Sequence, residues 1–90
     1  MGTALLKIRL MPTSPDVNLE EIKESAKKVI ELGKGMRVTF DEEPIAFGLK
    51  AVIANFDIDE ANELEPIENA LRETENINSA EVIDMRRAFG

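Results

Sequence analysis

Residues 36–58, MRVTFDEEPIAFGLKAVIANFDI, predict two β-strands joined by a loop of defined shape. Apolar and polar side chains alternate at the start of this stretch, and its end is apolar on both faces, which is typical of a central strand. Between the strands, Pro44 fixes one backbone dihedral and Gly48 permits angles that other residues avoid. The loop carries Ile-Ala-Phe, where an ordinary connection has Asn, Asp, Ser or Gly. Its aromatic residue, Phe47, therefore either folds back into the core or is offered to a partner.

Period-two patterns predict four strands in all, over residues 3–11, 36–40, 49–58 and 80–87. In the first strand one face is wholly apolar: Ala4, Leu6, Ile8 and Leu10. A turn over residues 76–79 precedes the last strand. Three methionines are expected to fill the core or a face of the sheet: Met11, Met36 and Met85.

Helical spacing of apolar residues predicts two helices, one from about Leu19 to Leu32 and one over residues 64–75. Asp16 or Asn18 can cap the first helix, and Asn18 followed by Glu21 resembles a capping box. The first helix ends at two glycines, and the second accepts a proline in its first turn, where no backbone N–H is needed: Gly33, Gly35 and Pro66.

The element order is therefore βαββαβ, the split βαβ pattern of the ferredoxin-like fold. We expect an α+β sandwich in which right-handed crossovers place both helices on one face of a four-stranded antiparallel sheet. Ninety residues with 43% apolar and 32% charged side chains are expected to form a single domain over residues 1–90.

The missing residue types exclude several kinds of site. Without cysteine there are no disulfides, thiolate ligands or cysteine nucleophiles, and without histidine the usual general base and the commonest metal ligand are absent. A serine-type triad or a transition-metal site is therefore not expected. The chain has no apolar run of membrane-spanning length and no signal-peptide pattern, so we expect a soluble cytoplasmic protein.

A formal net charge of −7 disfavours binding to nucleic acid or to an anionic membrane, and it suits either solubility or a basic protein partner. Asp41, Glu42 and Glu43 have the ligand atoms that Mg²⁺ prefers, but three consecutive acids favour solvated charge or a surface facing a basic partner. A second acidic group lacks the spacing and central glycine of a calcium loop and predicts a polar turn: Asp57, Asp59 and Glu60.

Three segments together carry a family resemblance. They are Ser14-Pro15-Asp16-Val17-Asn18-Leu19-Glu20, Glu43-Pro44-Ile45-Ala46-Phe47-Gly48-Leu49, and Ala80-Glu81-Val82 with Met85-Arg86-Arg87 near the end. In these segments the chain resembles the archaeal translation elongation factor 1-beta family, the free-standing equivalent of a eukaryotic exchange domain. The resemblance covers essentially the whole chain, and the Glu-Pro-Ile-Ala-Phe-Gly-Leu run is its most specific part.

The resemblance implies guanine-nucleotide exchange on the GTPase elongation factor 1-alpha, so that GTP replaces spent GDP during protein synthesis. Such a factor performs no bond chemistry of its own, is not an enzyme in that sense, and needs no cofactor or metal. The resemblance also implies a protein partner rather than direct contact with nucleic acid or membrane. We expect the factor to be a monomer when it is free.

By resemblance, two parts of the chain contact the switch and phosphate region of the GTPase. The first is the loop, with Phe47 as its anchor; its other members are Glu43, Pro44, Ile45, Ala46 and Gly48. The second is a base near the carboxyl terminus, where Arg87 is the best match and Arg86 the alternative, the two pointing to opposite faces of an extended strand. The eukaryotic domain has a lysine there, and arginine's planar fork differs from a compact ammonium. Without the resemblance, both arginines are ordinary solvated charges.

The rival hypothesis is a small-molecule regulatory module of the same topology, which binds an amino acid and dimerises through its sheet. The mixed outer face of the first strand suits it. The segment after that strand, Pro12-Thr13-Ser14-Pro15, is not a glycine-rich ligand loop, and this favours the exchange factor.

Overall fold

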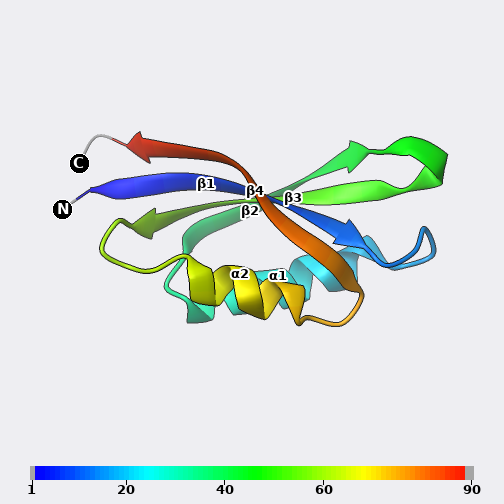
Figure 1. Cartoon of the computed structure of the whole chain (residues 1–90), viewed down its shortest axis with the longest axis horizontal. Helices are drawn as coiled ribbons and strands as arrows, with labels where there is room; N and C mark the ends of the chain where they lie inside the picture. The colour runs from blue at the N-terminus through cyan, green and yellow to red at the C-terminus, as the bar shows by residue number, and fades with distance from the viewer. Residues whose placement is uncertain (1, 89–90) are drawn as a thin grey trace.

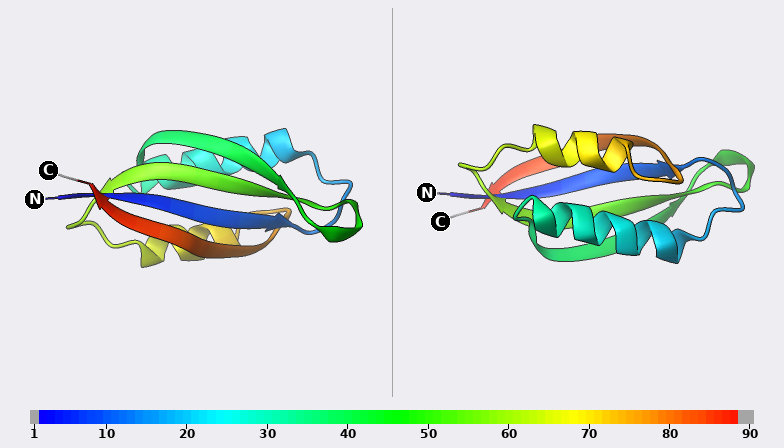
Figure 2. Two further views of the ribbon diagram at one scale, coloured as in Figure 1. Left: turned by 90° about the horizontal axis from the view of Figure 1, so that it is seen from above. Right: turned by 90° about the horizontal axis from the view of Figure 1, so that it is seen from below.

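The computed structural model describes residues 2–88, with the side chain of residue 88 excluded. Its elements follow in the order β1 (Thr3–Pro12), α1 (Leu19–Leu32), β2 (Met36–Pro44), a 3-10 turn (Ala46–Gly48), β3 (Lys50–Asp59), α2 (Glu65–Arg72) and β4 (Ile77–Ala88). The strands form one antiparallel sheet in the order β2-β3-β1-β4, and both helices cover the same face (Figures 1 and 2). This is the predicted ferredoxin-like arrangement.

The core lies between the sheet and the two helices. The alternation in β1 places Leu6, Ile8 and Leu10 in that layer, all buried, whereas Leu5 and Lys7 are exposed on the other face. The core continues through β3, the inner faces of both helices and the start of β4: Ile22, Ala26, Ile30, Val52, Ala54, Phe56, Ile58, Ile67, Leu71, Ile77 and Ala80. β1 and β3 occupy the centre of the sheet, as the two-sided apolar pattern of β3 predicts.

Helix α1 begins and ends where its capping residues predict. The Asn18 side-chain oxygen accepts a hydrogen bond of 2.9 Å from the backbone N–H of Glu20, so Asn18 is the N-cap. At the other end, the N–H of Gly33 donates to the Val29 carbonyl over 3.1 Å, and that of Gly35 donates to Ile30 over 2.8 Å. Neither helix in residues 2–88 is long and apolar enough to cross a membrane.

Three predicted boundaries were wrong. β2 continues to Pro44, so the acidic triplet lies within the strand and not after its end; β4 begins at Ile77; and α2 ends at Arg72. β2 tolerates its acids because it is an edge strand, where charged side chains are common. Because successive side chains of a strand point to opposite faces of the sheet, the three acids of β2 are divided between its two faces.

The start of β2 is irregular, and this affects the position of Met36. The pairing of β2 with β3 shifts between Met36 and Thr39, where Arg37 has a positive φ of 52°. This irregularity interrupts the alternation of side chains between Met36 and the half-buried Val38, and Met36 is exposed. Met85 is exposed as well, so neither methionine fills the core; Met11 is half-buried.

Candidate functional site

The connection between β2 and β3 has the defined shape that its proline and glycine predict. The N–H of Ile45 donates to the Leu49 carbonyl over 2.7 Å, and the N–H of Leu49 donates to Ala46 over 3.3 Å, so the loop is closed across its base. At the tip, both Phe47 (φ 63°, ψ 33°) and Gly48 (φ 78°) are left-handed. Glycine adopts this conformation freely, whereas a residue with a side chain pays about 1–2 kcal/mol for it.

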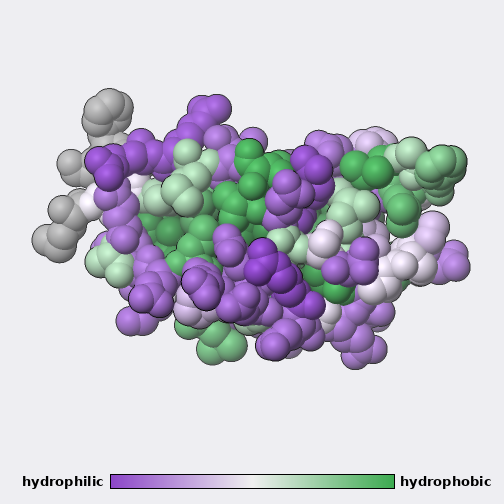
Figure 3. Space-filling view, in the orientation of Figure 1, coloured by the Kyte–Doolittle hydropathy of each residue, from purple (hydrophilic) through white to green (hydrophobic). Residues whose placement is uncertain are grey.

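The ring of Phe47 projects into solvent and does not fold back into the core. Its exposed fraction is 96%, the largest among the exposed large hydrophobic residues of the described chain. Glu43, Pro44, Ala46 and Gly48 are also exposed, and only Ile45 of this predicted group is half-buried. Figure 3 shows hydrophobic surface at the end of the molecule that this connection forms. The core alternative for Phe47 is therefore wrong, and the loop presents an aromatic side chain on strained backbone, a combination that concentrates at functional sites.

A second segment of the family resemblance lies beside this loop. Ser14 and Pro15, in the connection between β1 and α1, line a surface hollow together with Gly48 and Lys50. The remaining lining residues come from the same connection and its flanks: Pro12, Val17 and Leu19. The two most specific segments of the sequence thus meet at one end of the molecule, a neighbourhood that the sequence patterns alone did not reveal.

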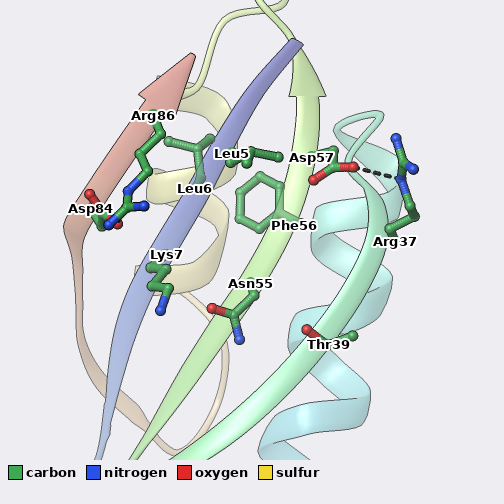
Figure 4. A pocket seen from close by; sticks show the side chains of 10 residues that line it. All are labelled: Leu5, Leu6, Lys7, Arg37, Thr39, Asn55, Phe56, Asp57, Asp84 and Arg86. Carbon is green, nitrogen blue, oxygen red and sulfur yellow. Dashed lines mark hydrogen bonds and ion pairs between the residues drawn. The ribbon is translucent and has the colours of Figure 1, made fainter. Parts of the chain in front are cut away.

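The two arginines near the end of β4 lie on opposite faces of the sheet, as predicted for consecutive strand residues. Arg86 is opposite the exposed Leu5, and its Nε donates to Asp84 Oδ2 over 3.1 Å. It lines a hollow on the sheet face away from the helices, with Lys7 and Asn55 on neighbouring strands (Figure 4). Arg87 is opposite Ala4, which packs against the core, and therefore lies on the helix side. There its Nε is 2.7 Å from Glu60 Oε1.

Phe47 and Arg87 do not come together. Arg87 pairs with Ala4, and Ala4 pairs with Ile58 near the end of β3, whereas Phe47 precedes the start of β3 at Lys50. Ile58 follows Lys50 by eight positions in β3, which corresponds to about 26 Å at about 3.3 Å per residue. Figure 1 shows the start of β1 and the end of β4 at the opposite end of the molecule from the β2–β3 connection, and the longest dimension is 42 Å. The two predicted contact parts therefore lie at opposite ends of the sheet and do not form one compact site.

The acidic triplet does not form a metal site. Glu42 lies on the helix side, where its Oε2 is 2.8 Å from Lys23 Nζ in α1. On the other face, Asp41 Oδ2 accepts a hydrogen bond from Asn55 Nδ2 over 2.9 Å, and Glu43 Oε1 lies 3.9 Å from Arg9 Nε. Within residues 2–88, no three acidic side chains gather so that they could hold a metal ion.

Lys23 and Glu42 shift each other's titration. The hydrogen bond and the charge of Lys23 lower the pKa of Glu42 below its ordinary 4.5. The hydrogen bond to Glu42 is also the main reason why the pKa of Lys23 is raised above 10.5, and Glu20 contributes to the same shift. This ion pair connects α1 to β2.

Comparison with known proteins assigns the fold and the family. A family model described as "EF-1 guanine nucleotide exchange domain" matches residues 5–88. The chain belongs to this family. Exchange domains of this kind are guanine-nucleotide exchange factors of translation elongation, which agrees with the function implied by the sequence and decides against the amino-acid-binding rival.

Curated relatives match the exchange domain over nearly its full length. A protein named "Elongation factor 1-beta" from Methanocaldococcus jannaschii is 44% identical, with 98% of this chain and 100% of the relative covered. One of the same name from Methanosarcina barkeri is 41% identical, with 97% and 99% covered. The relatives are archaeal, as the resemblance indicated.

Among solved structures, ribosomal protein S6 from Thermotoga maritima superimposes with a TM-score of 0.60. The match covers 97% of the exchange domain and 89% of S6 at 22% identity. At this identity the likeness shows the shared fold alone.

Proposed function

We propose that this exchange domain acts on the GTPase elongation factor 1-alpha and promotes the replacement of GDP by GTP, without bond chemistry or a cofactor of its own. The observation that carries the proposal is the fully presented ring of Phe47, at the tip of the segment most specific to the family. The names of the relatives, elongation factor 1-beta, support the same partner. We further propose that the free factor is a cytoplasmic monomer.

Phe47 is the anchor of the first contact. A desolvated aromatic ring in a partner pocket is a typical source of binding energy at the centre of an interface. The loop is closed by the hydrogen bond from the Ile45 N–H to the Leu49 carbonyl, so the backbone that carries the ring is shaped before the partner binds and needs little ordering. The exposed Pro44, Ala46 and Gly48 supply the rim of this contact.

Arg87 supplies the second contact, at the nucleotide. Its guanidinium is permanently charged and has the planar fork that matches phosphate oxygens. A cation inserted there competes with Mg²⁺ for the phosphates and for the acids that bind the metal. The lysine of the eukaryotic domain is a compact charge, so an arginine acts here more by holding phosphate oxygens than by mimicking the metal.

The sheet joins these contacts rigidly. Because β3 and β1 run between the two ends, docking of Phe47 on one part of the GTPase fixes where Arg87 lies on another. Exchange then follows from linkage: a factor that binds the nucleotide-free GTPase more tightly must lower nucleotide affinity by the same ratio. A ratio of about 1000 corresponds to roughly 4 kcal/mol of coupling.

Release of a fluorescent GDP analogue from the archaeal GTPase tests the proposal. Substoichiometric amounts of the exchange domain should accelerate release, because an exchange factor turns over. Unchanged release at saturating protein would refute the proposal.

A further inference from the structure

Arg87 is not a free charge at the strand end, because Glu60 holds it. Arg87 Nε lies 2.7 Å from Glu60 Oε1, and Glu60 follows β3 directly. The side chain of Arg87 is 81% exposed, and that of Glu60 is 29% exposed. The more buried member is thus the acid, and the base extends from it into solvent.

Glu60 is itself fixed by the first residues of the chain. Its backbone N–H donates to the Gly2 carbonyl over 3.0 Å. Its carboxylate lies against the Gly2 backbone so closely that a Cβ on Gly2 would be 2.5 Å from Glu60 Oε1 and 2.8 Å from Cδ. The backbone of Glu60 is therefore held by Gly2, its carboxylate lies beside Gly2, and a larger residue at position 2 would displace that carboxylate.

We propose that Glu60 is a positioning residue for Arg87: it keeps the guanidinium on the helix side of the strand end, ready to meet the nucleotide phosphates. The proposal rests on the role given to Arg87 in the proposed function. A long, exposed arginine loses side-chain conformational entropy when it is immobilised on binding. An ion pair with a fixed acid removes part of that loss before the GTPase is met.

The second arginine provides a matched comparison. Arg86 also pairs with an acid, Asp84, at 3.1 Å, but on the other face of the sheet. Asp84 belongs to the same strand two residues away, whereas Glu60 belongs to the connection after β3. Only the Arg87–Glu60 pair fixes the base relative to another part of the fold.

The test measures GDP release from the GTPase with Glu60→Gln and with Gly2→Ala, which keeps both charges but displaces the carboxylate. Each should slow maximal release about two- to fivefold, since an exposed ion pair contributes at most about 1 kcal/mol. The concentration of factor at half-maximal rate should change little. The effect should shrink at high salt, where exposed charges are screened. Asp84→Asn should have a smaller effect.

A double-mutant cycle separates positioning from a general structural role. In the Arg87→Ala background, Glu60→Gln should have no further effect on release, because the residue that it positions is gone. A similar slowing in that background, or faster release by Glu60→Gln alone, would overturn the proposal. If Arg87→Ala itself leaves release unchanged, the role of Arg87 in the proposed function fails first, and the positioning role of Glu60 fails with it. Equal melting temperatures of the variants show that the fold is intact.

Discussion

Phe47 and Arg87 lie at opposite ends of the same sheet, separated by at least the length of β3 between Lys50 and Ile58. One is an exposed ring on a closed loop, and the other is a guanidinium held by an acid. A partner that uses both must therefore offer two distinct contact points.

Replacement of Phe47 by Ala should reduce the rate of GDP release by at least about tenfold, equivalent to about 1.4 kcal/mol of lost interaction. The free energy of unfolding should change by no more than about 0.5 kcal/mol, because the ring is 96% exposed. Release kinetics and urea denaturation of the same preparation check both parts.

Leu32 provides the control for this substitution, since it is another exposed apolar residue, on α1 and outside the β2–β3 loop. Leu32→Ala should leave release unchanged. A loss of about 3–5 kcal/mol of stability in Phe47→Ala, as for a buried phenylalanine, would contradict the exposed ring. Equal losses of exchange in both variants would show that the effect is not specific to the loop.

Substitution of Arg87 by Ala should slow GDP release and leave affinity for the nucleotide-free GTPase nearly intact, because the base acts where phosphate and metal are bound. Arg87→Lys should keep much of the activity, since the ammonium retains the charge. The effect of Arg87→Ala should also become smaller when Mg²⁺ is chelated. Stopped-flow release with and without chelator measures this.

Arg86→Ala is the internal control and should matter less, since Arg86 lies on the other face of the sheet. If both alanine variants lose activity equally, the position of Arg87 on the helix side is not what matters. No loss for Arg87→Ala would leave exchange to the loop around Phe47.

The Lys23–Glu42 pair should make stability depend on pH at the acidic end. The folded pKa of Glu42 is lowered, so its contribution is present above the unfolded value of 4.5 and is lost as pH falls through the folded pKa. Lys23 has a raised pKa, and its contribution is lost only as pH rises above 10.5. Glu42→Gln should therefore be less stable than the original chain at neutral pH, and the difference should vanish well below pH 4.5.

Urea denaturation at the two pH values measures this difference. Glu24→Gln, at an exposed position of α1, the helix that carries Lys23, is the control for loss of a charge. A difference that persists unchanged in acid would mean that Glu42 acts through packing and not through its charge.

An added methyl group at Gly35 should lower the free energy of unfolding, because this glycine packs against the core. It is buried, and a Cβ there would collide with the side chain of Ile30 and lie 3.1 Å from Phe56 Cδ2. Gly35→Ala should therefore lower the free energy of unfolding by about 1–3 kcal/mol. Thermal and urea unfolding test this, and an unchanged midpoint would show that the core shifts to accept the methyl group.

Much of the fold could be predicted because local patterns and the core agree. The alternation in residues 3–11 separates Leu6 and Ile8 from Leu5 and Lys7, and Asn18 and Gly33 mark the ends of α1. The extension of β2 was missed because consecutive acids have low strand propensity, and their partners, Lys23 of α1 and Asn55 of β3, are distant in the sequence.

The site was predicted in parts but not as an arrangement. The loop sequence is compatible with a Phe47 ring packed in the core and with one exposed to a partner. The left-handed backbone at the tip of the loop cannot be inferred from residue types. The separation of Phe47 from Arg87 had a signal: in an antiparallel βαββαβ sheet, the start of β3 and the end of β4 lie at opposite ends of β1. Glu60 had none, since its role depends on a long-range contact with Arg87 and Gly2.

The most direct test of the two-ended account is complementation in the GDP-release assay. Phe47→Ala and Arg87→Ala are each measured alone and then mixed in equal amounts, with the original chain as reference. If one rigid sheet must present both ends to the same GTPase, the mixture will release GDP no faster than the sum of the two variants. Recovery of the mixture toward the rate of the original chain would contradict the account, because the two ends would then act from separate molecules.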